Sequence, residues 1–490
     1  MTTVRIVLDA HHLRGLGRNE SRFADLAAAF ADGSRTLHVP AALLSRLAAD
    51  LQPAEISRIL QLARIVPSRR SDLAACFAGD AQDLDALSLR AAERVLAHAF
   101  ITEQEALRGR SDVCTLAGLE PHLQNRRLPL QFTDLAQPQA DHLEALDERL
   151  ERVLRHGQYI MGPEVRELET ALARRLGVKH AISVSNGTVA IELALRALRI
   201  GPGDEVITIP FTWISTAEVI PWVGATPVFV DIRPDTFCMD PELLAAAITP
   251  RTRAVIPVSL FGQMPRLEEI NALAARHGIA VIEDAAQSFG ATRHGRASGA
   301  CSTLATTSFF PSKPLGCYGD GGAVFTDDDR LADLVRALRT HGGLVRHHHT
   351  EVGTNARMDT LQAAIVLANL GHFDAATAQR QAAAAEYSAQ LTAHGLAGPV
   401  TDTGNSHVWA QYTIRVADRA AAAARLTAAG IPHAIYYPAC VHQQPAFAQL
   451  MRTPQPLEAS AAAAREVLSL PMHGHLDAAT IRRTVAILAG

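Results

Sequence analysis

The chain has 490 residues, of which 48% are hydrophobic and 20% charged, and its formal net charge is −4 at pH 7. That length exceeds what a single compact core usually supports, so we expect two or three domains. The near-balanced charge and the lack of a long apolar run argue against a nucleic-acid surface and a membrane span. The six cysteines form no Cys-x-x-Cys pair, which favours reduced thiols in the cytoplasm over a structural zinc site.

Residues 1–120 open with a short strand and continue as a helix-rich region with scattered acids. The order of segments resembles a PIN-type nuclease domain, and the resemblance is carried by residues 4–9, 38–44, 80–87 and 99–104. Domains of that type bind Mg²⁺ or Mn²⁺ through clustered carboxylates, and Asp9 and Asp83 fit this pattern. Gln104 stands where a further acid is expected, so the resemblance implies a degenerate PIN-like domain. A solvated helical face explains the scattered acids equally well.

A polar, proline-punctuated stretch over residues 121–135 predicts a linker. Residues 136–375 then alternate strands and helices, which predicts a large domain with a mostly parallel sheet covered on both faces. The expected strands are the β-branched runs at 181–184, 205–209, 228–231, 254–258 and 279–284. Residues 376–490 are alanine-rich and mostly helical with one clear strand at 410–416, which predicts a smaller C-terminal α+β domain.

Lysine is nearly absent from this chain, and its placement is informative. Of the 46 Lys and Arg residues only Lys179 and Lys313 are lysines, so arginine supplies the ordinary surface charge. Arginine cannot replace lysine where a neutral amine must attack a carbonyl, because the guanidinium stays protonated. Lys313 lies in a loop rich in Ser, Pro and Gly, as expected of a Schiff-base lysine. A genome that favours arginine codons is the alternative explanation for its isolation.

Two further motifs fall at the ends of predicted strands. Residues 185–188 (Ser-Asn-Gly-Thr) open a helix, whose free N–H groups favour an anion, although plain N-capping explains them too. Asp284 ends a strand, with Gln287 three residues later, so its carboxylate is expected at the sheet edge where α/β proteins bind ligands. A carboxylate there could keep a pyridine nitrogen protonated, as pyridoxal phosphate (PLP) requires, whereas helix capping is the simpler role.

Two more side chains complete a recognisable order along the chain. Ser308 lies five residues before Lys313 and could contact a phosphate. Trp213 follows a strand and could stack on an aromatic ring or fill the core. An anion loop, an aromatic residue, a strand-end Asp and a loop Lys, in that order, match PLP enzymes of the aspartate aminotransferase fold.

Three segments resemble the DegT/DnrJ/EryC1/StrS family of sugar aminotransferases, namely residues 282–291, 308–322 and 352–364. The resemblance extends from about residue 130 to the end, and it implies a PLP-dependent transferase of fold type I. It also implies a homodimer with shared active sites. Within the family, these segments are most similar to UDP-2-acetamido-2-deoxy-3-oxo-glucuronate aminotransferases of bacterial surface-polysaccharide pathways. The expected reaction moves an amino group from L-glutamate to a 3-oxo nucleotide sugar.

The resemblance further implies roles for matching residues. Lys313 would bind the cofactor as a Schiff base and move the reacting proton, since a freed amine can act as general base and acid. Asp284 would pair with the pyridine nitrogen, and Gln287 would contact the ring hydroxyl. The other cofactor contacts would be the phosphate-binding Gly187, Thr188 and Ser308, the ring-covering Trp213, and Asn355, which would reach the cofactor phosphate of the partner subunit. Arg357 would bind acidic substrate groups, although a surface ion pair is its alternative role.

One departure from the family pattern affects the substrate. Close relatives carry a His-Tyr-Pro triplet near the substrate, where this chain has Tyr436-Tyr437-Pro438. Tyr437 matches, but Tyr436 replaces a histidine and is not cationic near neutral pH. Another UDP- or dTDP-linked ketosugar therefore remains an alternative substrate.

Two other hypotheses concern metal ions and the N-terminal domain. The three consecutive histidines at 347–349 have no further ligand at metal spacing, so we favour a loop beside the substrate over a metal site. A metal-dependent RNase activity of residues 1–120 is a further hypothesis, opposed by the incomplete set of acids. A scaffold role for that domain beside catalysis stays open.

Overall fold

The computed structural model describes residues 130–135 and 142–490, together with five strands within residues 1–129. Contacts separate the chain into two units, Met1–Pro129 and Leu130–Gly490. The five strands of the first unit pair in parallel in the order β3-β2-β1-β4-β5. They are β1 Val4–Leu8, β2 Arg35–Pro40, β3 Ala63–Val66, β4 Ala99–Ile101 and β5 Val113–Cys114.

The first unit therefore contains more β-structure than its helix-rich sequence predicts, because strands this short leave little alternating pattern to detect. A parallel sheet is common to many α/β folds, so the PIN-like fold stays a prediction. Asp9, Asp83 and Gln104, on which the nuclease hypothesis depends, lie outside the described residues.

The second unit is built around a seven-stranded sheet of order β6-β14-β13-β10-β9-β7-β8. Only β14 runs antiparallel to its neighbours, so the sheet is mixed and mostly parallel, as expected. The strands are β6 His180–Val184, β7 Glu205–Thr208, β8 Thr226–Phe229, β9 Thr252–Ile256, β10 Ala280–Asp284, β13 Leu304–Ser308 and β14 Gly322–Thr326. A short hairpin, β11 Thr292–Arg293 with β12 Arg296–Ala297, follows β10.

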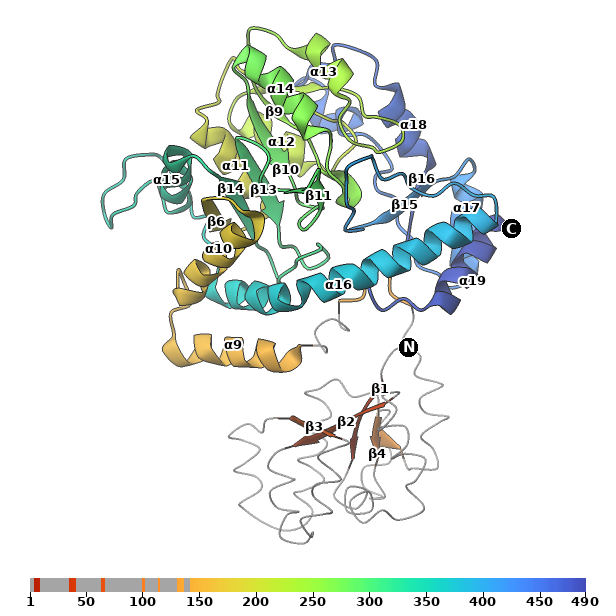
Figure 1. The fold of residues 1–490 in the computed structure, drawn as a ribbon. Helices are drawn as coiled ribbons and strands as arrows, with labels where there is room; N and C mark the ends of the chain where they lie inside the picture. The colour runs from red at the N-terminus through yellow and green to blue at the C-terminus, as the bar shows by residue number, and fades with distance from the viewer. Residues whose placement is uncertain are drawn as a thin grey trace. The chain divides into compact units, whose positions relative to one another are not determined.

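Helices cover both faces of this sheet (Figure 1). One face carries α11 Gly187–Ala197, α12 Ser215–Trp222 and α15 Asp329–Arg339. The other carries α10 Pro163–Leu176, α13 Pro241–Ala247, α14 Leu267–His277 and part of α16 Thr360–Ala393. Helix α9 Leu143–His156 packs on the outside of α16. Alternate residues of one strand enter opposite cores: in β10, Val281 packs on the side of α14 and Ile282 on the side of α11.

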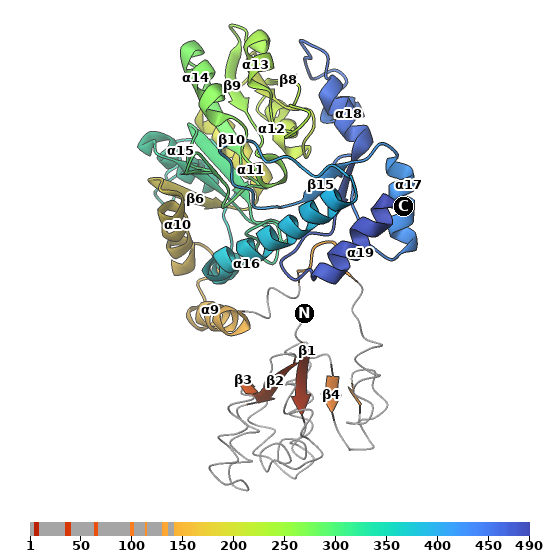
Figure 2. The ribbon, with the colours of Figure 1, turned by 45° about the vertical axis from the view of Figure 1, so that its right-hand side comes forward.

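Figure 2 shows α16 continuing from the large sheet to the small C-terminal sheet, where α19 lies beside it. The small sheet is antiparallel and consists of β15 Tyr412–Arg415 and β16 Val467–Leu470. The remaining helices are α17 Arg419–Ala428, α18 Glu458–Glu466 and α19 Ala478–Ala489. The small core combines both strands with the C-terminal half of α16. The predicted boundary at 375/376 falls inside this continuous helix and stays a prediction.

Candidate active site

Segments far apart in the sequence leave one edge of the large sheet. Parallel strands end at the same edge, so the residues after β6, β7, β9, β10 and β13 lie close together. The antiparallel β14 starts at this edge, where Gly322 pairs with Ser308 and with Val184. The sequence-predicted residues Asp284 and Ser308 are thereby the last residues of neighbouring strands.

Asp284 is buried at this edge and is held by two donors. The Thr216 hydroxyl donates to its Oδ2 at 2.8 Å, and the Ala286 N–H donates to its Oδ1 at 3.2 Å. Burial raises the pKa of the Asp284 carboxyl above its ordinary value, while these two donors and the Lys313 ammonium oppose the shift. A cation that faces Asp284 would offset the cost of burying the ionised carboxylate, so the two charges would attract each other strongly.

Lys313 lies partly buried in the loop between β13 and β14, where its N–H donates to the carbonyl of Phe310 at 2.8 Å. Burial lowers the pKa of the Lys313 ammonium, and the Asp284 carboxylate opposes that shift. A lowered pKa increases the fraction of neutral amine, which is the form that attacks a carbonyl.

Gln287 is fixed in one orientation by two hydrogen bonds. Its Oε1 accepts from the backbone N–H of Phe261 at 2.7 Å, and its Nε2 donates to the Tyr437 hydroxyl at 3.2 Å. Phe261 has a φ of 59°, an unfavourable conformation for a residue with a side chain. The turn around Phe261 must therefore be held by its surroundings for this orientation to persist.

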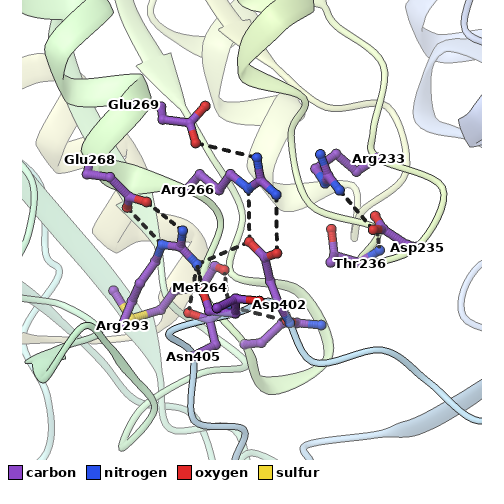
Figure 3. A network of polar contacts seen from close by, with 12 residues as sticks. Arg233, Asp235, Thr236, Met264, Arg266, Glu268, Glu269, Arg293, Asp402 and Asn405 are labelled. Atoms are coloured by element: carbon purple, nitrogen blue, oxygen red, sulfur yellow. Dashed lines mark hydrogen bonds and ion pairs between the residues drawn. The ribbon is translucent and has the colours of Figure 1, made fainter.

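The surroundings hold that turn through a polar network in which arginine side chains converge on Asp402 (Figure 3). Arg266 Nε donates to Asp402 Oδ2 at 3.0 Å, and Arg293 Nη1 donates to the same oxygen at 3.1 Å. Asn405 Nδ2 donates to the carbonyl of Met264 at 2.7 Å. Next to this network, Gln263 Oε1 accepts from the Asp402 N–H at 3.0 Å. These hydrogen bonds attach Asp402 and Asn405, which follow α16 in the sequence, to the turn that fixes the orientation of the Gln287 side chain.

A tight cradle forms where α11 begins. A Cβ on Gly187 would lie only 2.8 Å from Ser308 Cβ, so glycine lets the Ser308 strand end approach the helix. Asn186 caps α11 by accepting from the Val189 N–H at 2.9 Å, and the Thr188 hydroxyl pairs with Ser215 at 2.8 Å. Helix N–H groups and hydroxyls gathered this closely form an anion site suited to a phosphate.

Aromatic rings line the space beside Gln287. Trp213 is 59% exposed, so it is not a core residue, and its ring centroid lies 6.4 Å from that of Tyr437. Tyr436 follows at 5.8 Å from Tyr437 and 6.0 Å from Phe132. Burial raises the pKa of both tyrosines, which keeps them neutral. These rings are suited to cover flat ligand surfaces.

Asn355 and Arg357 lie on a segment attached to the phosphate cradle. The carbonyl of Ala356 accepts from the Ser185 N–H at 2.9 Å, directly before α11. Asn355 is exposed, and Arg357 Nε is buried without a hydrogen-bond partner among the residues that the structure describes. Within those same residues, no group of three His, Cys, Asp or Glu side chains could hold a metal ion.

These features are those of one class of enzyme, the fold type I, PLP-dependent transferases, and the candidate cofactor site lies at the carboxyl edge of a mixed sheet. Residues 141–489 match the family model of the DegT/DnrJ/EryC1/StrS aminotransferases. The chain belongs to this family, which confirms the prediction from sequence.

Similar proteins extend over nearly the whole length of the second unit. The chain is 52% identical over 359 residues to the UDP-2-acetamido-2-deoxy-3-oxo-D-glucuronate aminotransferase of Pseudomonas aeruginosa, covering 73% of this chain and 99% of that protein. A crystal structure of DesV from S. venezuelae in complex with a ketimine intermediate matches at 40% identity and a TM-score of 0.71, covering 74% of this chain and 98% of that one. A Bacillus subtilis protein with bound cofactor PMP matches at 30% identity and a TM-score of 0.68, covering 74% and 86%. This chain is accordingly a PLP-dependent aminotransferase acting on nucleotide sugars.

The residues of this chain fit that cofactor. The Gly187 cradle offers an anion site for the phosphate, and the buried Asp284 carboxylate offers a counter-charge for the pyridine nitrogen. The Asp284 carboxylate acts on the pKa of the Lys313 ammonium, which places the two charges within electrostatic range of each other. None of the helices in the described part of the chain combines the length and apolarity needed to span a bilayer.

Sequence reasoning missed Thr216 and the turn at Phe261. Thr216 gave a detectable signal, because it lies in a run of hydroxyl residues after a predicted strand. Phe261 gave no such signal, because its backbone N–H makes the contact and any residue carries that group.

Proposed function

We propose that this enzyme transfers an amino group from L-glutamate to UDP-2-acetamido-2-deoxy-3-oxo-D-glucuronate, in a cytoplasmic step of bacterial surface-polysaccharide synthesis. The observation that carries the proposal is the 52% identity to the Pseudomonas aeruginosa enzyme across 99% of that enzyme's length. The described site supplies the groups that such a reaction needs.

The cofactor supplies an electron sink that stabilises negative charge at the carbon losing its proton. Gly187, Thr188 and Ser308 would hold its phosphate, and Asp284 would keep its ring nitrogen protonated. Gln287 would donate to its ring hydroxyl, because one Nε2 hydrogen is used by Tyr437 and the other is available.

Lys313 would carry the cofactor covalently and then work as the acid and base. Its amine would remove the proton from the α-carbon of the amino donor in the first half-reaction. In the second half-reaction the same group would return a proton to C3 of the sugar. The lowered pKa of Lys313 suits this alternation, because the group can exchange protons nearer to neutral pH.

We propose a homodimer as the active unit. Asn355 is exposed, and the buried Nε of Arg357 has no hydrogen-bond partner among the described residues. A partner subunit would give these side chains their ligands: the cofactor phosphate for Asn355 and an acidic substrate group for Arg357. Sedimentation at several protein concentrations would test this, and a monomer with full activity would contradict it.

A second candidate substrate is another UDP- or dTDP-linked 3-ketosugar, favoured by one observation. Tyr436 packs edge-on against Phe132 and is partly buried, so it offers a neutral hydroxyl where relatives offer histidine. An uncharged group there weakens the argument for a sugar with a carboxylate at C6.

The test is mass-spectrometric detection of amino sugars formed from L-glutamate and each ketosugar in turn. We expect product with the 3-oxo-glucuronate, none with the Lys313→Ala variant, and undiminished product with Lys179→Ala. Lys179 is a matched control because it is the only other lysine and its side chain is 62% exposed. Product only with a dTDP-linked sugar would support the second candidate, and no product with any ketosugar would reject both.

A further inference from the structure

We propose that Glu283 is a positioning residue for the cofactor, because its buried carboxylate holds Asp284 and Gln287 in place. This inference rests on the proposed function, since those two side chains are the ones assigned there to the cofactor ring. Glu283 directly precedes Asp284 in β10. Successive side chains of a strand point to opposite faces of a sheet, so Glu283 points away from the face of Asp284 and acts only through its neighbours.

The Glu283 carboxylate is fully buried, and three uncharged groups donate to it. The hydroxyls of Ser259 and Ser298 donate to its Oε1 at 2.7 and 2.6 Å, and the Gly299 N–H donates to its Oε2 at 2.9 Å. Burial raises the pKa of the Glu283 carboxyl, whereas these three donors oppose that shift. Burying a carboxylate is costly even when it is hydrogen-bonded, so packing alone does not explain a glutamate here. Its hydrogen bonds indicate what it holds.

The first element that Glu283 holds is the backbone at Asp284. Ser259 makes two contacts at once, because its hydroxyl donates to Glu283 and its N–H donates to the carbonyl of Asp284 at 2.9 Å. The Asp284 N–H donates in turn to the carbonyl of Pro257 at 3.0 Å. Residues 257–259 are thereby tied to β10 on both sides of the Asp284 Cα. Loss of the Glu283 contact would therefore let the Asp284 carboxylate shift.

The turn that orients Gln287 starts from the same serine. Ser259 precedes the short turn Leu260–Gly262, in which the Phe261 N–H donates to Gln287 Oε1 at 2.7 Å. The φ of 59° at Phe261 makes this turn unfavourable on its own. The hydrogen bond from the Ser259 hydroxyl to Glu283 fixes the point from which the turn starts.

A chain of two hydroxyls connects Glu283 to the residue after Gln287. The Ser288 and Ser298 hydroxyls pair at 2.7 Å, and Ser298 donates its own hydrogen to Glu283. The Ser288 hydroxyl is therefore the donor within the pair. Both serines and Glu283 are fully buried, so bulk water cannot replace these bonds. Glu283 thus anchors the chain directly before Asp284 and directly after Gln287.

The test compares Glu283→Gln with Glu205→Gln. Glutamine has nearly the same shape as glutamate but only one acceptor oxygen, so at position 283 it cannot accept from donors on both sides. Glu205 is a matched control because it is also buried, at 1% exposed, and accepts from the Thr249 hydroxyl at 2.6 Å. It begins β7, whereas Asp284 ends the parallel β10, so the two lie at opposite edges of the sheet. Both changes should lower the melting temperature.

Two readings of the cofactor separate a positioning role from a role in stability. For Glu283→Gln we expect the dissociation constant of pyridoxal phosphate to rise by ~10- to 100-fold in a titration of the apoenzyme followed by visible absorption. The pH midpoint of the bound cofactor's absorption should also move by about one unit or more, because a displaced Asp284 carboxylate stabilises charge on the ring nitrogen less well. Glu205→Gln should change neither reading.

Wild-type affinity and a wild-type pH midpoint in a folded Glu283→Gln protein would overturn the proposal and leave Glu283 a role in stability alone. If that variant does not fold, Ser259→Ala and Ser298→Ala each remove one donor, and we expect each to weaken cofactor binding by ~3- to 10-fold. Wild-type affinity in both serine variants would likewise overturn it. An enzyme whose cofactor affinity depends on Glu283 but which aminates no ketosugar would reject the proposed function and leave this positioning role in place.

Discussion

The Gly187→Ala variant probes the phosphate cradle with a single added methyl group. The new Cβ would lie 2.8 Å from Ser308 Cβ and 3.3 Å from Ser308 Oγ. Carbon atoms pack at about 3.5–4.0 Å, so the strand end and α11 must separate by ~1 Å. Overpacking of this size costs ~1–3 kcal/mol. Part of that cost falls on the cofactor, because the separation opens the helix terminus and the hydroxyl that would hold its phosphate.

We expect the dissociation constant for pyridoxal phosphate to rise by ~10- to 100-fold, which equals ~1.4–2.8 kcal/mol. The assay is titration of the apoenzyme with the cofactor, followed by its visible absorption. Gly371→Ala is the control, because nothing lies within 4 Å of that Cβ and the residue is inside α16. There alanine should stabilise the helix by up to ~1 kcal/mol and leave cofactor binding unchanged. If a folded Gly187→Ala variant binds pyridoxal phosphate as tightly as the wild type, the close approach at Gly187 is not needed to hold the cofactor phosphate.

Three further results are expected. Thr216→Val removes the donor on Asp284 Oδ2, so it should raise the pKa of that carboxyl and slow turnover, at a cost of ~1–3 kcal/mol; steady-state kinetics would show it. Gln263→Ala should lower the free energy of unfolding by ~1–3 kcal/mol by releasing the turn at residues 260–263, as urea denaturation would measure. Burial lowers the pKa of His407 to about 3 and that of His473 to about 4, so the unfolded chain binds more protons below about pH 6.5. Stability should therefore be complete above about pH 6.5 and fall toward about pH 4, by up to ~1.4 kcal/mol per pH unit for each histidine.

Matched measurements would expose errors in these three expectations. Thr236→Val removes a buried hydroxyl without a partner among the described residues, so it should leave turnover unchanged. Equal kinetics for Thr216→Val and Thr236→Val would show that the donor on Asp284 is irrelevant. A Gln263→Ala protein as stable as the wild type would show that contacts other than those of the Gln263 side chain hold the turn. Constant stability between about pH 7 and about pH 5 would contradict the neutral, buried state of the two histidines.

Much of the large sheet could be predicted because buried parallel strands are continuous β-branched runs. The predicted run at 279–284 differs from β10 by one residue, and its last residue, Asp284, lies at the expected edge. Strands β13 and β14 were missed, because Leu304–Ser308 is rich in threonine and alanine, and Gly322–Thr326 begins with glycine. Strand β13 thus lacks the apolar run that marks the others, and the short run in β14 directly follows a glycine-rich loop, which hides where the strand begins.

The candidate site could be predicted where a side chain carries the chemistry, as with Lys313 and Asp284. The parts of the site that are formed by backbone groups or by residues distant in the sequence could not be predicted. The orientation of Gln287 depends on the N–H of Phe261, and that turn is held by Asp402, more than one hundred residues later in the sequence. Such contacts leave no local pattern, because they arise only when the small domain packs on the large one.

The central claim is that Lys313 carries the cofactor, and borohydride reduction of the holoenzyme followed by peptide mass spectrometry tests it most directly. Reduction should fix the cofactor irreversibly on the peptide that contains Lys313, with none on Lys179. Cofactor fixed only on Lys179, or no covalent cofactor on a protein that still aminates sugars, would contradict the account.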